Sequence, residues 1–319
     1  AIADFRAALS YDPDNYAYEL SLTRALVASQ HYDEAEAYLA SLAERMPQDG
    51  DVNLQLARLA VHNDKYEDAV RYYHRAIYGL WSSDPDTNRR HARLELVDFL
   101  LDHGQRMEAQ SELIASAASL PPDPQLHLAV ADRFLRAQDH QDALDQYREV
   151  IQLDRNNSAA HLGAGKAAFQ LGEYRTAQRY LQVALDGGVQ DADAQLMLKT
   201  TELVLAADPS RPNLPPGERR HRIAAAFQQA GERANQCLES IDQNSAATTE
   251  DPLRTLRAHW VGLEPNMRHD ARSADASALD DAMENVIQIE QAAQARCGQP
   301  QGLDLALLLI ARNREGAER

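Results

Sequence analysis

The sequence is poor in the residues from which zinc sites, disulfide frameworks and nucleic-acid surfaces are built. Two cysteines in 319 residues are too few for a disulfide scaffold or a cysteine-based zinc site. Lysine and arginine number 32 against 49 acidic residues, and the resulting formal charge of −17 repels a phosphate backbone. We therefore expect a chain that binds no nucleic acid.

Sequence motifs of catalysis and of membrane insertion are also missing. The chain has no GxxxxGK[ST] phosphate loop, no HExxH metal pair and no GxSxG nucleophile turn, and its histidines lack metal-ligand spacing. Its most apolar run, LDLALLLIAR at 303–312, is too short to cross a bilayer. These absences predict a non-enzymatic protein with no cofactor, no metal ion and no membrane-inserted helix in this chain.

What the sequence does contain is a 34-residue period. Alanines recur at intervals of 34, 34, 40, 34 and 34 residues, and a large residue follows each alanine four positions later. The alanines are Ala1, Ala35, Ala69, Ala109, Ala143 and Ala177, and the large residues are Phe5, Leu39, Tyr73, Leu113, Tyr147 and Leu181. Self-similarity at this period predicts a stack of supersecondary units, each of which buries its apolar face against the next.

The clearest copy, residues 158–191, indicates what one unit is. Apolar residues at helical spacing precede Gly172, which tolerates the left-handed backbone that ends a helix, and a second apolar stripe follows it. This copy therefore predicts two helices in an antiparallel hairpin. Gly165 and Ala177 are small where the two helices would cross, which would allow their axes to approach closely.

The pattern resembles the tetratricopeptide repeat. The family's turn tyrosine and closing proline recur here beside the alanine series, as Tyr32, Tyr66, Tyr174, Pro13, Pro47 and Pro121. The resemblance implies an all-α fold, a right-handed α–α superhelix whose function is to bind other proteins. Abundant arginine beside only three lysines indicates a GC-rich bacterial source.

The period divides the chain into a repeat array at 1–207 and a C-terminal helical region at 218–319. The array comprises a half repeat at 1–15, repeats at 16–49, 50–83, 90–123, 124–157 and 158–191, and a capping helix at 192–207. Four prolines between 209 and 216 predict an extended connector at 208–217. Apolar stripes in the C-terminal region predict a helical cap or bundle with helices at 216–241, 252–263, 274–297 and 303–313.

One interval of the period is 40 residues long instead of 34. The additional residues lie within AIYGLWSSDPDTNRR at 76–90 and bring Tyr78 and Trp81 into the junction. Two placements are open for them, a lengthened second helix or a protruding loop.

The two cysteines, Cys237 and Cys297, fall near the C-terminal ends of two predicted helices with one helix between them. An up-down-up arrangement would bring those ends together, so a disulfide is one hypothesis and two reduced core thiols are the other. A disulfide would indicate an oxidising compartment such as a periplasm. The location is otherwise unknown, and we favour an exported protein slightly over a cytoplasmic one.

The resemblance also implies a concave groove, because in the family the first helices line it through their second, fifth, ninth, twelfth and thirteenth positions. Carried onto this chain, the candidate groove residues are Leu20, Arg24, Leu54, Arg58, Leu94, Asp98, Asp102, Leu128, Asp132, Leu162, Lys166 and Phe169. An apolar ladder flanked by charges that change sign suits a peptide bound in one direction. Two alternatives are open: the fifth-position leucines pack inside each unit, and Asp98 and Asp102 form an ordinary solvated helix face.

These features predict an interaction scaffold that binds a peptide or protein segment in its groove. One alternative is a structural or self-assembling module, because a second copy of the chain would cover Ile2, Phe5 and Leu9 on the opening helix, giving a homo-oligomer. The other alternative is a docking arm of a larger protein, since the sequence opens inside a repeat without an initiator methionine. The identity of the partner does not follow from these patterns.

Overall fold

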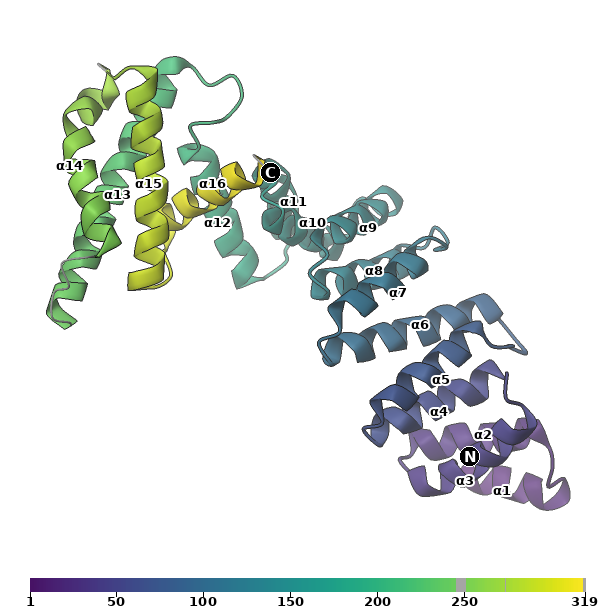
Figure 1. Ribbon diagram of the computed structural model, residues 1–319. Coiled ribbons are helices and arrows are strands. Elements are labelled where there is room, and N and C mark those ends of the chain that lie inside the picture. The colour runs from purple at the N-terminus through teal and green to yellow at the C-terminus, as the bar shows by residue number, and fades with distance from the viewer. Residues whose placement is uncertain (245–250, 273, 318–319) are drawn as a thin grey trace. The chain divides into compact units, whose positions relative to one another are not determined.

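The computed structural model describes residues 1–244, 251–272 and 274–317, and its regular structure there is α-helical (Figure 1). Sixteen helices occur in these ranges: α1 (Ile2–Tyr11), α2 (Tyr16–Ala28), α3 (Tyr32–Arg45), α4 (Gly50–His62), α5 (Tyr66–Tyr78), α6 (Pro85–Asp102), α7 (Arg106–Ala117), α8 (Pro124–Arg136), α9 (His140–Leu153), α10 (Ser158–Gln170), α11 (Tyr174–Asp186), α12 (Ala192–Ala207), α13 (Pro216–Asn244), α14 (Pro252–Ala271), α15 (Ala276–Cys297) and α16 (Gly302–Ala317). No strand occurs among the described residues, although Asp49 and Leu80 form an isolated parallel bridge. The predicted all-α class is confirmed.

The helices gather into two compact units. Unit 1 is Ala1–Leu153 and contains α1–α9, and unit 2 is Asp154–Arg319 and contains α10–α16. The division proposed from the sequence, with boundaries at 207 and 217, follows the repeat period instead of compactness and remains a proposal.

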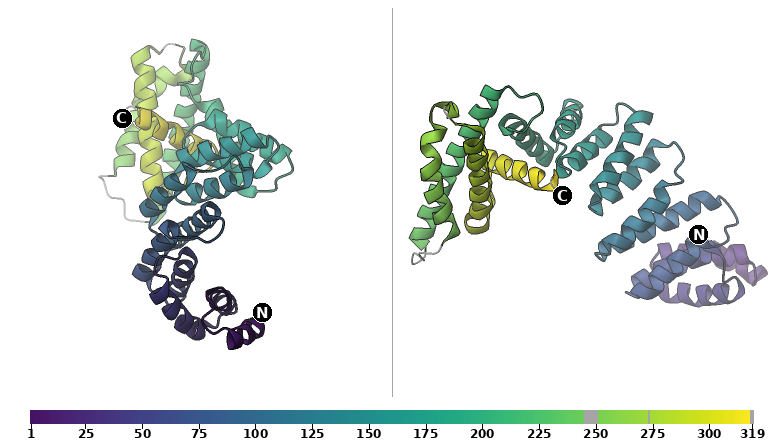
Figure 2. Two further views of the ribbon diagram at one scale, coloured as in Figure 1. Left: turned by 90° about the vertical axis from the view of Figure 1, so that its right-hand side faces the viewer. Right: turned by 45° about the horizontal axis from the view of Figure 1, so that its top comes forward.

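Unit 1 consists of an opening helix and four helical hairpins stacked in chain order (Figure 2). The repeat alanines lie where the two helices of each hairpin meet, and Ala35, Ala69, Ala109 and Ala143 are fully buried. Three of the four first helices of unit 1 begin at a side-chain cap: Asn15 at the start of α2, Asp49 at the start of α4 and Asp123 at the start of α8 accept backbone N–H groups. The side chain of Asp84, before α6, makes no such hydrogen bond. The small residue at the helix crossing is therefore common to all four hairpins, whereas the side-chain cap is common to three.

The opening helix α1 packs against α2 in the same unit. Ile2, Phe5 and Leu9 are half-buried beside the buried side chains of Leu22 and Leu26. These apolar side chains therefore have a partner helix within the chain. Self-assembly through them stays a prediction.

The 40-residue interval lengthens a helix, but not the second helix of its unit. α5 ends at Tyr78 after 13 residues, the same length as α11, whereas α6 begins at Pro85 and has 18 residues. The additional residues therefore extend the first helix of the following unit and form the loop before it. A lengthened second helix, one of the two placements considered above, is wrong.

The loop between α5 and α6 folds back onto the start of α4. The backbone N–H of Leu80 donates to the Gln48 carbonyl, and the N–H of Gly50 donates to the Leu80 carbonyl, both at 2.8 Å. The half-buried indole of Trp81 donates its N–H to the Ala76 carbonyl at 2.9 Å and lies so close to Gly50 that a Cβ there would overlap the ring. The loop is thus packed against its neighbour and does not protrude.

Unit 2 begins with the hairpin formed by α10 and α11. A Cβ at Gly165 would lie 2.7 Å from the side chain of Leu181, and Ala177 is fully buried, so the small residues permit the close crossing that the sequence predicts. α12 follows the hairpin, and α16 packs against it. Asn313 of α16 donates a hydrogen bond of 3.0 Å to the Gly172 carbonyl, which fixes the C-terminal helix against the turn of the last repeat.

The remaining helices of unit 2 form a bundle in which α13, α14 and α15 pack against one another. The predicted helix at 252–263 is too short, because its apolar stripe fades at Leu263 whereas α14 continues through Pro265 with Met267 and Ala271 buried. A disulfide joins Cys237 of α13 to Cys297 of α15, with the two Cα atoms 5.7 Å apart.

One carboxyl group lies in the core of unit 2. Glu290 of α15 has no exposed surface, and its Oε2 lies 3.3 Å from the Nε atom of Arg233. Arg233 also pairs with Asp304 of α16 at 3.4 Å. Burial, reinforced by the Asp304 charge and opposed by Arg233, raises the pKa of Glu290 to about 8.

This pKa predicts that unit 2 loses stability as the pH rises. The folded-state pKa lies above the ordinary value of 4.5, so the protonated carboxyl favours folding below about pH 4.5 and this contribution is lost as the pH rises through about 8. Glu290→Gln removes the titrating group, so the variant should gain stability relative to the parent across this window, by at most about 1.4 kcal/mol per pH unit. Chemical unfolding at several pH values measures the difference.

The matched control is Asp280→Asn on the same helix, whose side chain is 66% exposed. Its stability difference from the parent should stay nearly constant with pH. Parallel pH profiles for the parent and Glu290→Gln would contradict the prediction.

Candidate protein-binding surface

The candidate groove residues lie on the first helices of the hairpins, as the period predicts. In unit 1 they come from α2, α4, α6 and α8, and in unit 2 they come from α10. The two sets belong to different compact units.

The basic side chains of the set pair with acidic residues on the next first helix. Arg24 of α2 forms an ion pair with Asp51 of α4. Arg58 of α4 forms two hydrogen bonds to Glu95 of α6, Nη2 to Oε1 at 2.5 Å and Nε to Oε2 at 3.0 Å. The hydrogen bond to Glu95 raises the pKa of Arg58 above its ordinary value. These charges therefore connect neighbouring repeats.

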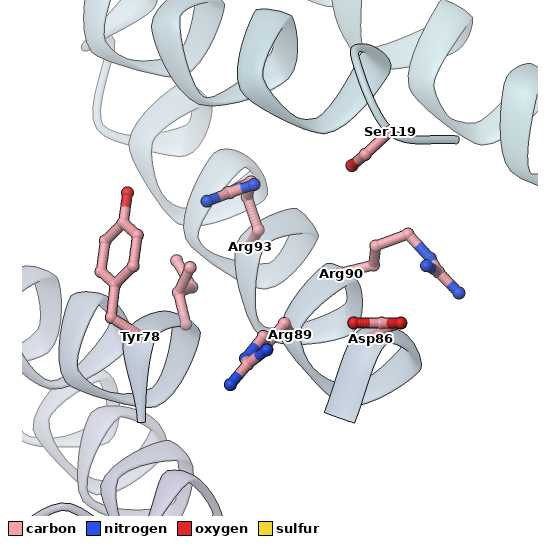
Figure 3. Close-up of a pocket in the computed structure, with 7 residues that line it drawn as sticks. Tyr78, Asp86, Arg89, Arg90, Arg93 and Ser119 are labelled. Carbon is pink, nitrogen blue, oxygen red and sulfur yellow. The ribbon is translucent and has the colours of Figure 1, made fainter. Parts of the chain in front are cut away.

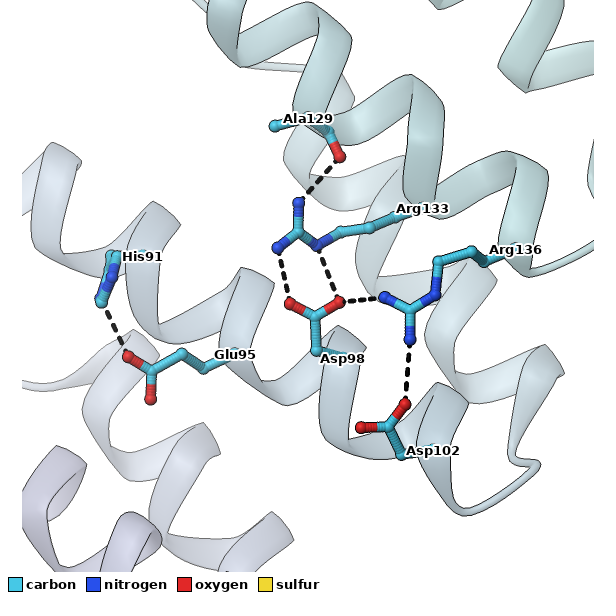
Figure 4. Close-up of polar contacts among 7 residues, drawn as sticks. All are labelled: His91, Glu95, Asp98, Asp102, Ala129, Arg133 and Arg136. Carbon is cyan, nitrogen blue, oxygen red and sulfur yellow. Dashed lines mark hydrogen bonds and ion pairs between the residues drawn. The ribbon is translucent and has the colours of Figure 1, made fainter. Parts of the chain in front are cut away.

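The acidic side chains of α6 are paired in the same way, with arginines of α8 (Figure 4). Arg133 donates to both carboxylate oxygens of Asp98, at 2.5 and 3.1 Å. Arg136 bridges the two aspartates, with one Nη atom 2.6 Å from Asp98 and the other 2.9 Å from Asp102. The pair of carboxylates four residues apart is thus held by two guanidinium groups, an arrangement of ion pairing and not of acid–base chemistry.

Asp132 of α8 is bonded within its own hairpin. It accepts the hydroxyl hydrogen of Tyr147 on α9 at 2.7 Å. Burial of the phenol, with the Asp132 charge as a second cause, raises the pKa of Tyr147. Asp132 remains exposed on its outer side.

The fifth-position leucines divide into two kinds. Leu20 and Leu54 are only 6% and 5% exposed, because they pack inside the unit, so they offer no surface to a ligand and leave the groove set. Leu94 and Leu128 are half-buried, and so are the twelfth-position residues Leu101 and Leu135. The exposed parts of the two adjacent helices form one surface, the α6–α8 face, defined by Leu94, Leu101, Leu128 and Leu135 with the charged residues Asp98, Asp102, Arg133 and Arg136.

The candidates on α10 have partners within unit 2. Lys166 donates to Asp191, the cap of α12, at 2.6 Å, and this hydrogen bond lowers the pKa of Asp191. Phe169 packs edge-on against Tyr174, with ring centroids 5.8 Å apart, at the margin of the unit 2 core. Leu162 remains half-buried.

Two family models for the tetratricopeptide repeat match the sequence, one over residues 1–59, 26–78 and 134–200 and the other over residues 94–160. The chain belongs to the tetratricopeptide repeat (TPR) family. Proteins of this family are generally scaffolds for protein–protein interaction without enzymatic activity, and the helical hairpins of this chain coincide with the matched repeats.

Several solved structures resemble the chain at low sequence identity. YrrB, described as a TPR protein with an unusual peptide-binding site, is 16% identical, with 63% of this chain and 100% of YrrB covered at a TM-score of 0.48. PilF of Pseudomonas aeruginosa is 18% identical, with coverages of 59% and 82% and a TM-score of 0.41. MamA AMB-1 is 17% identical, with coverages of 54% and 99% and a TM-score of 0.41.

The sequence analysis missed the residues of neighbouring TPR units that form ion pairs with the candidate groove residues. Asp51 follows Arg24 by 27 residues and Glu95 follows Arg58 by 37. Arg133 and Arg136 follow Asp98 by 35 and 38 residues. A search for opposite charges about one period apart would have found them. No cluster of three potential metal ligands and no membrane-spanning helix occurs in the part of the chain that the structure describes.

Proposed function

We propose that the chain is a TPR scaffold that binds a segment of another protein on the α6–α8 face. The observation that carries the proposal is the half-exposed leucine row of two adjacent first helices, Leu94 and Leu101 on α6 and Leu128 and Leu135 on α8. Contiguous apolar surface with a polar margin is typical of protein interaction sites. An extended or helical segment with apolar side chains at matching intervals suits such a face.

The ion pairs support the proposal by fixing the geometry of the face. Arg133 and Arg136 hold α8 to α6 through Asp98 and Asp102, so the leucines of the two helices keep a set spacing. A face that is ordered before binding costs less entropy when the partner docks. The charges therefore act mainly as positioning groups.

Some charged surface still remains available to a partner. The Asp102 side chain is 68% exposed and that of Arg136 is 48% exposed, at the ends of α6 and α8. A partner with complementary charges at this end would bind in one orientation, because like charges placed there are repelled.

The test identifies a partner of the full chain and then compares how tightly the parent and a double variant bind that partner. Affinity capture from the source organism followed by mass spectrometry identifies a partner, and its binding is then titrated. Leu94→Gln with Leu128→Gln should weaken binding by about tenfold or more, because two apolar contacts become polar. Helicity by circular dichroism should be unchanged, since both side chains are already partly solvated.

The matched control is Leu196→Gln, a leucine at the same repeat position in α12 that is 61% exposed. It should leave binding unchanged. Equal affinity of the parent and the Leu94/Leu128 variant would place the contact elsewhere and overturn the proposal.

A further inference from the structure

A second candidate site in unit 1 is a polar pocket beside the junction of α5 and α6 (Figure 3). Its volume is about 410 Å³. The residues that line it include Tyr78, Asp86, Arg89, Arg90, Arg93 and Ser119. We call it the arginine pocket, since its three arginines project from the first turns of α6.

The arginine pocket owes its existence to the break in the repeat period. α6 is 18 residues long because the inserted segment extends its N-terminal end from residue 90 back to Pro85. Positions 86, 89, 90 and 93 are spaced by three or four residues and so share one face of this extension. Tyr78 ends α5 across from them, and its side chain is 72% exposed. A regular 34-residue unit would lack the extension of α6 that contributes Asp86 and Arg89 to the pocket.

Two of the three arginines have no carboxylate partner. Arg93 is paired with Glu112, with Nε 3.0 Å from Oε2. In the part of the chain that the structure describes, Arg89 donates to the Gly79 carbonyl at 3.2 Å and Arg90 to the Thr87 hydroxyl at 3.3 Å. Among the described residues, neither guanidinium lies in an ion pair.

The Nε atom of Arg89 adds a second observation, because it is buried and makes no hydrogen bond in the described part of the chain. A buried donor without an acceptor costs free energy, and a ligand carboxylate toward which the guanidinium turns would remove that cost. The remaining arginines of unit 1 that lie on the α6–α8 face are bonded to carboxylates, as described above. The pocket is thus a local excess of positive charge in an acidic chain.

We propose that the arginine pocket binds an acidic segment of a protein partner, whose carboxylates pair with Arg89 and Arg90. Guanidinium groups bind carboxylates through two parallel hydrogen bonds, and the hydroxyls of Tyr78 and Ser119 are further donors in the wall. The negative charge of Asp86 repels a phosphate, which carries up to two negative charges, more strongly than it repels a single carboxylate. Carboxylates therefore fit the lining better than phosphates. The proposal rests on the proposed function, because it takes a protein as the partner. The pocket is a separate site, since it lies at the N-terminal end of α6 whereas Asp102 of the α6–α8 face lies at the C-terminal end.

The proposal is tested by isothermal titration calorimetry of the full chain with a defined probe, the acetylated and amidated peptide Glu-Phe-Glu. The neutral peptide Gln-Phe-Gln and inorganic phosphate are titrated in parallel. The acidic peptide should bind, its affinity should fall as NaCl is added, and Arg89→Gln with Arg90→Gln should lower the affinity by about tenfold or more. Asp86→Asn should raise it, an effect that a misfolded variant would not produce.

The matched control is Arg71→Gln with Arg106→Gln, the same change of charge at two exposed arginines of unit 1 outside the pocket. It should leave the affinity unchanged. Equal affinity for the two peptides, or an unchanged affinity in the Arg89/Arg90 variant, would overturn the proposal. Binding of phosphate without binding of the acidic peptide would also overturn it. Leu101→Gln with Leu135→Gln, which changes the α6–α8 face at the other ends of the two helices, should leave binding of the probe normal, so failure at the pocket is distinguishable from failure at that face.

Discussion

Replacing Trp260 by alanine is expected to lower the free energy of unfolding of unit 2 by about 3–5 kcal/mol, which is a large share of a typical domain's stability. Trp260 of α14 is 7% exposed, and its ring stacks on Phe227 of α13 with centroids 4.7 Å apart. Its indole N–H donates to the Phe227 carbonyl at 2.7 Å. The alanine variant therefore loses buried apolar area, an aromatic pair and a buried hydrogen bond together.

The position of Gly231 shows how closely the ring is fitted. A Cβ at this residue would lie 2.5 Å from the Trp260 ring, so the neighbouring backbone comes as near as a glycine allows. The close backbone of α13 at Gly231 limits how far the site can collapse into the space that the indole leaves. The expected loss therefore lies toward the upper part of the range for large-to-small substitutions.

Guanidinium unfolding followed by far-ultraviolet circular dichroism measures this effect. The chain has two tryptophans, Trp81 in unit 1 and Trp260 in unit 2, so Trp81→Ala is a matched control. Trp81 is only half-buried and lies in a loop, and its removal should cost less and affect unit 1. An unfolding transition of unit 2 that is unchanged in Trp260→Ala would contradict the packing described above.

Reduction of the Cys237–Cys297 disulfide is the second change with a large expected effect. The bond closes a loop with a sequence separation of 60 residues. Chain-entropy arguments give about 4 kcal/mol of stabilisation for a loop of this length, through the smaller number of conformations open to the unfolded chain. Reduced protein should therefore unfold at lower temperature or lower denaturant concentration than oxidised protein.

The experiment has a chemical and a thermodynamic readout. Reduction after unfolding should increase the intact mass by two hydrogens, and calorimetry before and after reduction should show the loss of stability. Cys237→Ala with Cys297→Ala is the control, because this variant should be insensitive to the reductant. A mass that does not change on reduction would mean that the two residues are reduced core thiols.

Most of the fold could be predicted from the sequence because local signals and periodicity agree at each repeat. The alanine series marks the helix crossings, Gly172 ends a first helix with a positive φ of 74°, and Gly165 sits where Leu181 leaves no room for a Cβ. The extension of α14 through Pro265 could not be predicted in this way. Proline usually ends a helix, and only the packing of Met267 and Ala271 in the unit 2 core shows that α14 continues.

The candidate surface could be predicted only in part, because its residues depend on neighbours about one period away. The sequence places Asp98 and Arg58 on first helices. It does not show that Asp98 forms an ion pair with Arg133, or that Arg58 forms one with Glu95. The fifth-position leucines look alike in the sequence, yet Leu20 is buried and Leu128 is half-exposed. How deeply a side chain is buried within a stacked unit depends on tertiary packing, which the repeat period alone does not predict.

The ion pairs between neighbouring first helices of unit 1 limit which hairpins could be exchanged or lost during evolution. α6 presents acidic residues to both neighbours, Glu95 to α4 and Asp98 to α8. Loss of α4 and α5 would bring Glu95 toward Arg24, which is an attractive pair. Loss of α6 and α7 would instead bring Arg133 toward Arg58, and the two guanidinium groups would repel each other. Charge pairing therefore disfavours loss of the third hairpin, α6 and α7, and is compatible with loss of the second hairpin, α4 and α5.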